Sequence, residues 1–261
     1  MEVPLKIREI IANKSGNIDN TGMSGASVYL YNDVVLKIQD YNKESNNEYK
    51  MMQWLFGKLP VPDIIEHTIT NKLSYLLMSK CAGKMACDKT FMADPKQQAK
   101  LLADTLQALW SVDVTDCPSD CRLSHKLEQA EYNVTNGLVD PNACEPETFG
   151  KGGFHDPETL LYWLKNNVPD EKPVLSHGDF CLPNILFADG KLSGLIDLGR
   201  SGIADRWCDI AICHRSLKHN YDGTYTGKQI KGYQETYLFD ALQIKPDWDK
   251  IRYYILLDEL F

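Results

Sequence analysis

The feature that most constrains this chain is the run His177-Gly178-Asp179-Phe180-Cys181-Leu182-Pro183-Asn184, followed by the triplet Asp197-Leu198-Gly199. It supplies a carboxylate, a carboxamide and a second carboxylate in the order that phosphoryl transfer from a nucleotide needs. Asp179 can hold a substrate hydroxyl. Asn184 and Asp197 offer the hard oxygen ligands that Mg²⁺ prefers. We interpret Asp179 as a catalytic residue and the other two as metal ligands.

The segment between Asn184 and Asp197 is predicted to be a β-hairpin. Two short apolar runs, Ile185-Leu186-Phe187 and Leu192-Ser193-Gly194-Leu195-Ile196, flank an Asp-Gly turn signal at Asp189-Gly190. A hairpin returns the chain to its start, so Asn184 and Asp197 are expected at its two open ends. Protein kinases place the same parts at the spacing H-R-D-x-x-x-x-N and then D-F-G. A turn-stabilising role is the alternative for Asp179 or Asn184 taken alone.

A second charged pair is predicted upstream. Lys37 interrupts the β-branched, apolar run from Val34 to Ile38, which is typical of a strand that carries a functional ammonium. In the following segment, Glu48 shares one helical face with Met51, Met52 and Leu55. A carboxylate on an apolar face needs a partner. We therefore expect a Lys37–Glu48 pair that fixes the ammonium for nucleotide phosphates; a solvated lysine and a surface glutamate are the alternative.

The small-residue turn from Thr21 to Ser27 precedes that strand, and its backbone N–H groups and the Ser24 hydroxyl could cover phosphates. The chain has neither G-x-G-x-x-G nor a Walker-type G-x-x-x-x-G-K-[ST] motif. An ordinary hairpin turn is the alternative interpretation of this segment.

Composition narrows the class of partner. The 261 residues include 36 acidic and 28 basic side chains and carry a net charge of -8, which argues against binding nucleic acid or an anionic membrane surface. No run is long and apolar enough for a membrane span, and the first residues do not resemble a signal peptide, so we expect a cytoplasmic protein. The eight cysteines form no C-x-x-C pair and are expected to be reduced thiols.

The expected organisation has two lobes. Residues 1–79 are predicted to form a strand-rich, nucleotide-binding lobe, residues 80–83 a hinge, and residues 84–261 a mostly helical catalytic lobe. Helical apolar spacing marks 95–112 and 123–136, and 140–156 is predicted to be a long loop. Asp156-Pro157 is expected to start the next helix, with Asp156 as its cap. The fold class predicted from these signals is α+β.

Taken together, these residues resemble the aminoglycoside phosphotransferases, which are kinase-like antibiotic resistance enzymes, and within them the 3′-phosphotransferases. The similarity covers nearly the whole chain, and the C-terminal D-E-L-F is its most specific element. It is carried by Gly22-Met23-Ser24, Met51-Met52-Gln53-Trp54-Leu55, Gly57-Lys58-Leu59-Pro60-Val61-Pro62, Leu76-Leu77-Met78-Ser79, Ser176-His177-Gly178-Asp179, Ile196-Asp197-Leu198-Gly199-Arg200-Ser201-Gly202, Trp207-Cys208-Asp209-Ile210-Ala211 and Ile255-Leu256-Leu257-Asp258-Glu259-Leu260-Phe261.

The resemblance implies a bilobal, protein-kinase-like fold and transfer of the γ-phosphoryl group of ATP, with Mg²⁺, to the 3′-hydroxyl of drugs such as kanamycin and neomycin. Asp179 would orient that hydroxyl, and Asn184 and Asp197 would bind Mg²⁺. The implied nucleotide contacts are Ser24, Lys37, Glu48, Met78, Ser79 and Cys81. The implied drug-facing residues are Glu145, Glu147, Arg200, Asp258, Glu259 and Phe261, the last through its carboxylate. The partners implied are therefore an aminoglycoside and a nucleotide; no oligomeric state follows from the sequence.

Three other functions are compatible with parts of the pattern. A related small-molecule kinase acting on choline, homoserine or a macrolide would share the catalytic run, but the D-E-L-F end argues against it. A protein kinase is expected to carry H-R-D and A-P-E elements, which this sequence lacks. A nonenzymatic nucleotide-binding regulator would usually have lost one of the four residues Lys37, Asp179, Asn184 and Asp197. We assign Asp209 a bracing role beside the catalytic run, through accepted backbone hydrogen bonds.

Overall fold

The structure is a computed structural model that describes residues 3–19 and 26–261. The chain divides into two compact units. The first is made of Met1–Ala86 with Pro183–Ser201, and the second of Cys87–Leu182 with Gly202–Phe261. Strands dominate the first unit and helices the second, which confirms the predicted α+β class. The boundaries 1–79, 80–83 and 84–261 remain a prediction.

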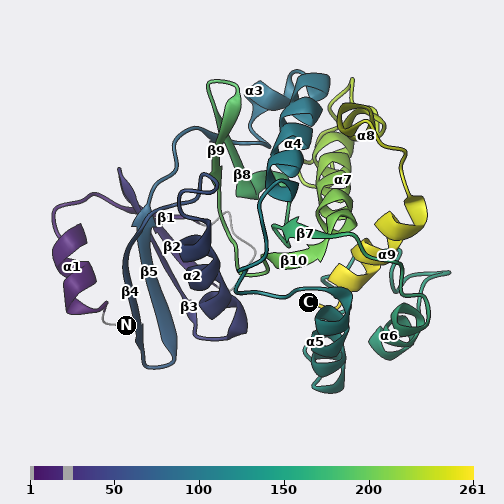
Figure 1. The fold of residues 1–261 in the computed structure, drawn as a ribbon, viewed down its shortest axis with the longest axis horizontal. Coiled ribbons are helices and arrows are strands. Elements are labelled where there is room, and N and C mark those ends of the chain that lie inside the picture. The colour runs from purple at the N-terminus through teal and green to yellow at the C-terminus, as the bar shows by residue number, and fades with distance from the viewer. Residues whose placement is uncertain (1–2, 20–25) are drawn as a thin grey trace. The chain divides into compact units, whose positions relative to one another are not determined.

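The first unit is built on a five-stranded antiparallel sheet with the strand order β1-β2-β3-β5-β4. Helix α2 lies beside this sheet (Figure 1). A second, three-stranded sheet has the order β6-β8-β9. The elements of this unit are α1 (Leu5–Ile11), β1 (Asn17–Asp19), β2 (Ser27–Leu30), β3 (Val34–Asp40), α2 (Lys43–Leu55), β4 (Ile64–Thr70), β5 (Leu73–Ser79), β6 (Lys84–Met85), β8 (Ile185–Ala188) and β9 (Lys191–Leu195).

Strand β3 separates an apolar face from a charged one because its side chains alternate. Val34, Leu36 and Ile38 are buried in one cluster with Ile7 of α1. Lys37 points to the opposite face, where it meets Glu48 of α2. The predicted strand and the predicted helical face of Glu48, Met51, Met52 and Leu55 are both confirmed, since all four of those side chains are buried.

Helix α7 is the most deeply buried long helix of the second unit and packs against α9 and β7. The elements of this unit are α3 (Lys89–Met92), α4 (Pro95–Trp110), α5 (Leu123–Thr135), α6 (Pro157–Asn166), β7 (Pro173–Ser176), β10 (Gly202–Asp205), α7 (Arg206–Asp222), α8 (Tyr237–Leu242) and α9 (Trp248–Asp258). Strands β7 and β10 pair antiparallel. The short 3₁₀ turn η1 (Leu182–Asn184) spans the change from one unit to the other.

The predicted helices and loop of this unit are also confirmed. Helices α4 and α5 occupy the two expected segments. No helix or strand interrupts residues 140–156. Asp156 caps α6 by accepting a hydrogen bond of 2.7 Å from the Thr159 backbone N–H, and Pro157 is the first helical residue. In the described part of the chain, every helix is too short or too polar to span a membrane. None of the eight cysteines, all of which lie in the described residues, forms a disulfide.

Candidate active site

The expected Lys37–Glu48 ion pair is present in the first unit and is buried. The Lys37 ammonium donates to both Glu48 oxygens, at 3.0 and 2.9 Å. Gln39, two residues further along the same face of β3, donates to Glu48 at 2.9 Å. Lys37 also contacts a second carboxylate, Asp197, at 2.9 Å. Lys37 is only 7% exposed and Glu48 2%, so water screens the attraction between them little.

The charge on Lys37 is set by competition between burial and these two carboxylates. Burial disfavours the ammonium, but Glu48 and then Asp197 outweigh that effect and raise the pKa of Lys37 above its ordinary value. The lysine is therefore held as a cation at neutral pH. A cation fixed in this way on a sheet is suited to bind phosphate oxygens.

Helix α2 also holds the segment that follows Asp197. The Asn47 side-chain amide donates to the carbonyl oxygens of Gly199 at 2.9 Å and Ser201 at 2.8 Å. Arg200 pairs with Glu44 through a contact of 3.0 Å. Asn47 and Glu44 of α2 and Lys37 of β3 thus hold the loop that begins at Asp197. Arg200, which the sequence assigned to the drug, is engaged with α2 in this structure.

The hairpin that joins the two predicted metal ligands is confirmed. Strands β8 and β9 pair antiparallel, and the turn residues Asp189 and Gly190 both have positive φ, at 51° and 71°, as a type I′ turn requires. The Ile196 N–H donates to the Asn184 carbonyl at 3.0 Å, so the two open ends of the hairpin lie side by side. Asn184 and Asp197 therefore sit on adjacent backbone segments.

The donor chemistry at these ends suits magnesium. Asp197 adopts a left-handed φ of 61°, which is unusual for a residue other than glycine, and its side chain is 43% exposed. Asn184 lies at the other strand end of the same hairpin and offers a carboxamide oxygen as a second ligand. Carboxylate and amide oxygens are hard ligands, and Mg²⁺ completes its shell with waters and phosphate oxygens. The residues present thus fit the metal that the sequence implied.

Asp179 lies in the second unit, in the loop that follows β7, and Asp209 braces that loop. The Asp209 carboxylate accepts hydrogen bonds from the His177 N–H at 2.8 Å, the Gly178 N–H at 2.9 Å and the Ser176 hydroxyl at 2.9 Å. The bracing role predicted for Asp209 is confirmed. Burial raises the pKa of this carboxyl, and the donors that surround it oppose the shift.

Of the residues expected to line an adenine slot, Met78 lies on the lysine-bearing face of the first sheet, whereas Ser79 pairs with Val34 of the opposite face. Met78 pairs across β3–β5 with Val35, and directly opposed residues of paired strands share a face, so both lie on the side of Lys37. The Ser79 N–H already donates to the Asp63 carbonyl at 2.9 Å. A contact from Ser79 to a base would therefore use its carbonyl. Cys81 is half-buried and lies against Gly194 of β9. Ser24 lies outside the described residues.

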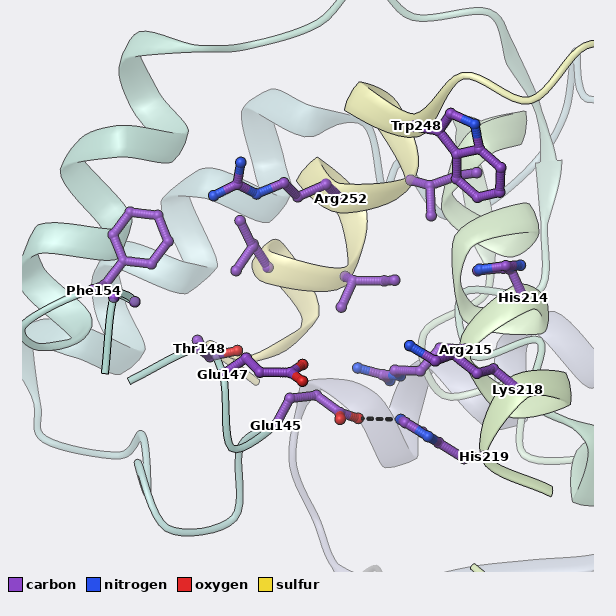
Figure 2. Close-up of a pocket in the computed structure, with 15 residues that line it drawn as sticks. Glu145, Glu147, Thr148, Phe154, His214, Arg215, Lys218, His219, Trp248 and Arg252 are labelled. Atoms are coloured by element: carbon purple, nitrogen blue, oxygen red, sulfur yellow. Dashed lines mark hydrogen bonds and ion pairs between the residues drawn. The ribbon is translucent and has the colours of Figure 1, made fainter. Parts of the chain in front are cut away.

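The acidic residues predicted to face the drug gather in the second unit. Glu145 and Glu147 line a cavity of about 350 Å³ that is also bounded by α7 and α9. Figure 2 shows their carboxylates directed toward basic side chains of α7. Glu145 pairs with His219 at 2.8 Å. The rest of the cavity is formed by Thr148, Gly152, Gly153, Phe154, His214, Arg215, Lys218, Trp248, Ile251, Arg252, Ile255 and Leu256.

The carboxylates at the end of α9 are held by Arg215. Its guanidinium contacts Asp258 and donates to Glu259 at 3.2 Å. Burial opposes the charge on Arg215, but the Asp258 and Glu259 carboxylates raise its pKa further above the ordinary value. Glu259 also accepts the Glu145 N–H at 2.8 Å, which ties the 140–156 loop to α9. Phe261, by contrast, is 38% exposed.

The contacts that sequence reasoning missed include Lys37–Asp197 and Glu145–His219. The first joins positions 160 residues apart and the second positions 74 residues apart, so no local spacing reports either. For His219 the available signal is a histidine on a helix that carries basic residues beside an acidic loop. That signal is too general to choose its partner.

Comparison with known proteins gives a consistent result. Residues 21–254 match the model of the phosphotransferase enzyme family. The aminoglycoside 3′-phosphotransferase of Enterococcus faecalis is 38% identical over 274 residues, which cover 100% of this chain and 99% of that protein. The aminoglycoside 3′-phosphotransferase of Campylobacter jejuni is 36% identical over 92% of this chain and 94% of its own length.

The fold is shared with a solved structure. The crystal structure of an aminoglycoside-3′-phosphotransferase of type VIII superposes with a TM-score of 0.83 and 26% sequence identity. The match covers 98% of this chain and 97% of that one. The kinase-like fold expected from the sequence is therefore confirmed.

Proposed function

Because this chain belongs to the phosphotransferase enzyme family, and within it to the aminoglycoside 3′-phosphotransferases, we propose that it transfers the γ-phosphoryl group of ATP to the 3′-hydroxyl of aminoglycosides such as kanamycin and neomycin. Phosphorylation of that hydroxyl confers antibiotic resistance. The observation that carries the proposal is that Lys37 is buried and contacts both Glu48 and Asp197. The cytoplasm, where ATP is available, is the proposed location.

The nucleotide-binding part of the proposal rests on the first unit. Lys37 would contact the α- and β-phosphates, with Glu48 fixing its position. Met78 would line the adenine slot, the Ser79 carbonyl would accept from the base, and the Cys81 backbone would complete the contact. Ser24 would belong to the phosphate-covering loop. The proposed lobes are 1–79 and 84–261, with 80–83 as the hinge.

Asp179 is proposed to act by orientation. Phosphoryl transfer passes through a loose transition state in which the attacking hydroxyl needs little deprotonation, so a correctly aimed hydrogen bond contributes more than a strong base does. The Asp209 contacts to three donors of the preceding loop support this role, because they limit how far Asp179 can move. Asn184 and Asp197 would hold Mg²⁺, whose charge would offset that of the β- and γ-phosphate oxygens.

The drug-binding part of the proposal rests mainly on the second unit. Aminoglycosides carry several ammonium groups, which carboxylates attract. Those of Glu145, Glu147, Asp258 and Glu259 and the carboxylate of Phe261 would form the acidic wall of the drug site. Arg200, although it pairs with Glu44, is proposed as a further drug-facing residue.

A coupled ADP-release assay tests the reaction class. Purified protein would be mixed with ATP, Mg²⁺ and one acceptor at a time: kanamycin, neomycin, choline or a macrolide. We expect saturable ADP release with the two aminoglycosides and background release with the others. Turnover of choline or the macrolide, with the aminoglycosides inert, would assign the chain to another small-molecule kinase activity.

A further inference from the structure

Helix α7 contacts the catalytic run, residues 177–184, at a second point besides Asp209. The Leu182 N–H donates to the hydroxyl oxygen of Ser216 at 3.0 Å. Leu182 is the first residue of the η1 turn, and the N–H groups at the start of a helical turn have no acceptor within that turn. Leu182 is 0% exposed and Ser216 3%, so this donor is shielded from water. Ser216 therefore supplies the acceptor that the turn lacks.

Ser216 and Asp209 lie on one face of α7. They are seven positions apart, which corresponds to two helical turns and about 10 Å along the axis. Asp209 accepts hydrogen bonds from residues 176–178, and Ser216 accepts from Leu182. Asp179 lies between these two anchored segments. One helix thus holds the chain on both sides of the residue proposed to orient the acceptor hydroxyl.

The Ser216 contact also bears on Asn184. The η1 turn contains only Leu182, Pro183 and Asn184. The ring of Pro183 fixes its φ, so the turn has few ways to bend between its two ends. A displacement of Leu182 is therefore passed on to the carboxamide that we propose as a magnesium ligand.

The hydroxyl of Ser216 is not explained by packing within α7. Its neighbours Ile212, Cys213 and Leu217 are buried apolar side chains. Alanine would suit such surroundings, and it favours a helix more than serine does. The use that the structure shows for the hydroxyl oxygen is the hydrogen bond that it accepts from Leu182.

We propose that Ser216 is a positioning residue for phosphoryl transfer: by holding Leu182 it fixes where Asp179 and Asn184 stand. This inference rests on the proposed phosphotransferase function. Ser216 is buried and acts on the reacting groups only through the run that it holds. Its loss therefore lowers kcat and raises the Mg²⁺ concentration needed for the half-maximal rate, while the KM for the drug stays the same.

The first variant is Ser216→Ala, which removes the acceptor oxygen and adds no volume. We expect kcat with kanamycin to fall about ten- to hundredfold, because small misplacements of aligned groups are costly. The Mg²⁺ concentration for the half-maximal rate should rise by about threefold or more. The drug KM should not change. These rates are compared at a temperature at which both proteins are folded.

Conservative variants test whether the acceptor atom is what matters. Ser216→Thr keeps a hydroxyl oxygen at the same position and should recover most of the kcat lost in Ser216→Ala. If the added methyl group prevents folding, Ser216→Cys replaces it. The cysteine sulfur is a weak acceptor of similar size, so kcat should lie between those of the wild type and Ser216→Ala.

The matched control is Thr105→Val on α4. Thr105 is 2% exposed, and its hydroxyl donates at 2.8 Å to the Leu101 carbonyl of the same helix. The substitution thus removes a buried hydroxyl of the second unit that makes a hydrogen bond within its own helix. We expect kcat, the drug KM and the Mg²⁺ dependence to match those of the wild type.

Amide hydrogen exchange of the protein without ligands measures the anchor independently of activity. The Leu182 amide should exchange about tenfold or more faster in Ser216→Ala than in the wild type, because its acceptor is gone. The same amide should exchange at the wild-type rate in Thr105→Val. Unchanged exchange at Leu182 in Ser216→Ala would show that Ser216 does not hold the run.

The outcomes separate this inference from the proposed function. A wild type that phosphorylates no aminoglycoside would remove the proposed function, and the exchange measurement would still decide whether Ser216 holds the run. With an active wild type, an unchanged kcat in Ser216→Ala, a change confined to the drug KM, or an equal loss of kcat in Thr105→Val would overturn the positioning role of Ser216 alone.

Discussion

The Lys37 cluster of the first unit and the carboxylates that pair with α7 in the second have opposite charge arrangements. In the first, one cation lies between two carboxylates, Glu48 and Asp197. In the second, carboxylates are held by basic side chains, with Arg215 on Asp258 and Glu259 and His219 on Glu145. We propose that Lys37 of the first binds nucleotide phosphates and that the carboxylates of the second bind ammonium groups of the drug.

The two clusters also differ in how deeply their ion pairs are buried. Lys37 and Glu48 are both almost fully buried, so removing either partner leaves the other as an unpaired, buried charge. The Glu145–His219 pair instead lines a cavity, and the Glu145 side chain is 24% exposed. We infer that the first site is pre-formed for its ligand.

Replacing Asp179, which belongs to neither cluster, should have the largest effect on turnover. Asp179→Ala is expected to lower kcat about a thousandfold or more, because the acceptor hydroxyl loses the group that aims it. Nucleotide affinity, measured by titration of a fluorescent ATP analogue, should stay within a few-fold of the wild type. Substantial residual turnover in this variant would remove Asp179 from the proposed catalytic role.

Lys37→Ala tests the claim that the first site is pre-formed. We expect kcat/KM for ATP to fall about a hundredfold. Unfolding stability should fall by about 3–5 kcal/mol, because Glu48 loses its ionic partner while remaining buried. Steady-state kinetics and denaturant titration measure the two effects.

The matched control for Lys37→Ala is Lys14→Ala. Lys14 also pairs with a carboxylate, that of Asp33 at 2.6 Å, but this pair is exposed. The control should change neither kinetics nor stability measurably. Equal effects of the two substitutions would show that burial of the Lys37 pair has no special role.

Removal of Phe261 tests its proposed place in the drug site of the second unit. Leu260 is fully buried and its carbonyl accepts from the Asn133 side chain at 2.8 Å, so a cut before Leu260 would confuse packing with binding. Phe261 is partly exposed and can be removed alone. We expect the drug KM to rise about three- to tenfold, because the terminal carboxylate moves from Phe261 to the buried Leu260, with the KM for ATP unchanged. An unchanged drug KM would contradict its placement in the drug site.

The smallest effect is expected at Asp156, which lies in neither cluster. The hydrogen bonds from Thr159, and then the contact with His155, lower the pKa of this carboxyl to about 2 from the ordinary 3.8. A lowered pKa means that the ionised cap stabilises the fold above about pH 4 and that this contribution is lost as pH falls toward about 2. Asp156→Ala should therefore lower the melting temperature by a few degrees at neutral pH, and by less in acid.

Asp156→Asn is the control for that measurement, because asparagine keeps a capping oxygen without a titratable group. Its melting temperature should lie close to that of the wild type at neutral pH, and kcat should be unchanged in both variants. A deficit in Asp156→Ala that does not shrink as the solution is acidified would show that the charge of the cap contributes nothing.

Features whose signal lies within a short segment could be predicted from the sequence. The alternation that buries Lys37 on one face of β3, the helical spacing that buries Glu48, and the Asp-Gly turn between β8 and β9 are all local patterns. Their combination also predicted the Lys37–Glu48 pair, since a buried cation and a buried anion on adjacent elements need each other.

Contacts between distant segments could not be predicted in this way. Nothing near Lys37 indicates that Asp197 is its second partner. Helix α7 is buried on almost every side, so its residues show no apolar periodicity that would single out the face carrying Arg215 and His219. That the carboxylates proposed to face the drug are paired with Arg215 and His219 could therefore be learned only from the structure.

The most direct test of the central claim is the position of the transferred phosphate. The purified protein would be incubated with ATP, Mg²⁺ and kanamycin, and the product analysed by mass spectrometry and phosphorus NMR. We predict a singly phosphorylated drug with the phosphate on the 3′-oxygen and no reaction with the 3′-deoxy analogue. Equal phosphorylation of the 3′-deoxy analogue, or release of ADP without a phosphorylated drug, would contradict the account.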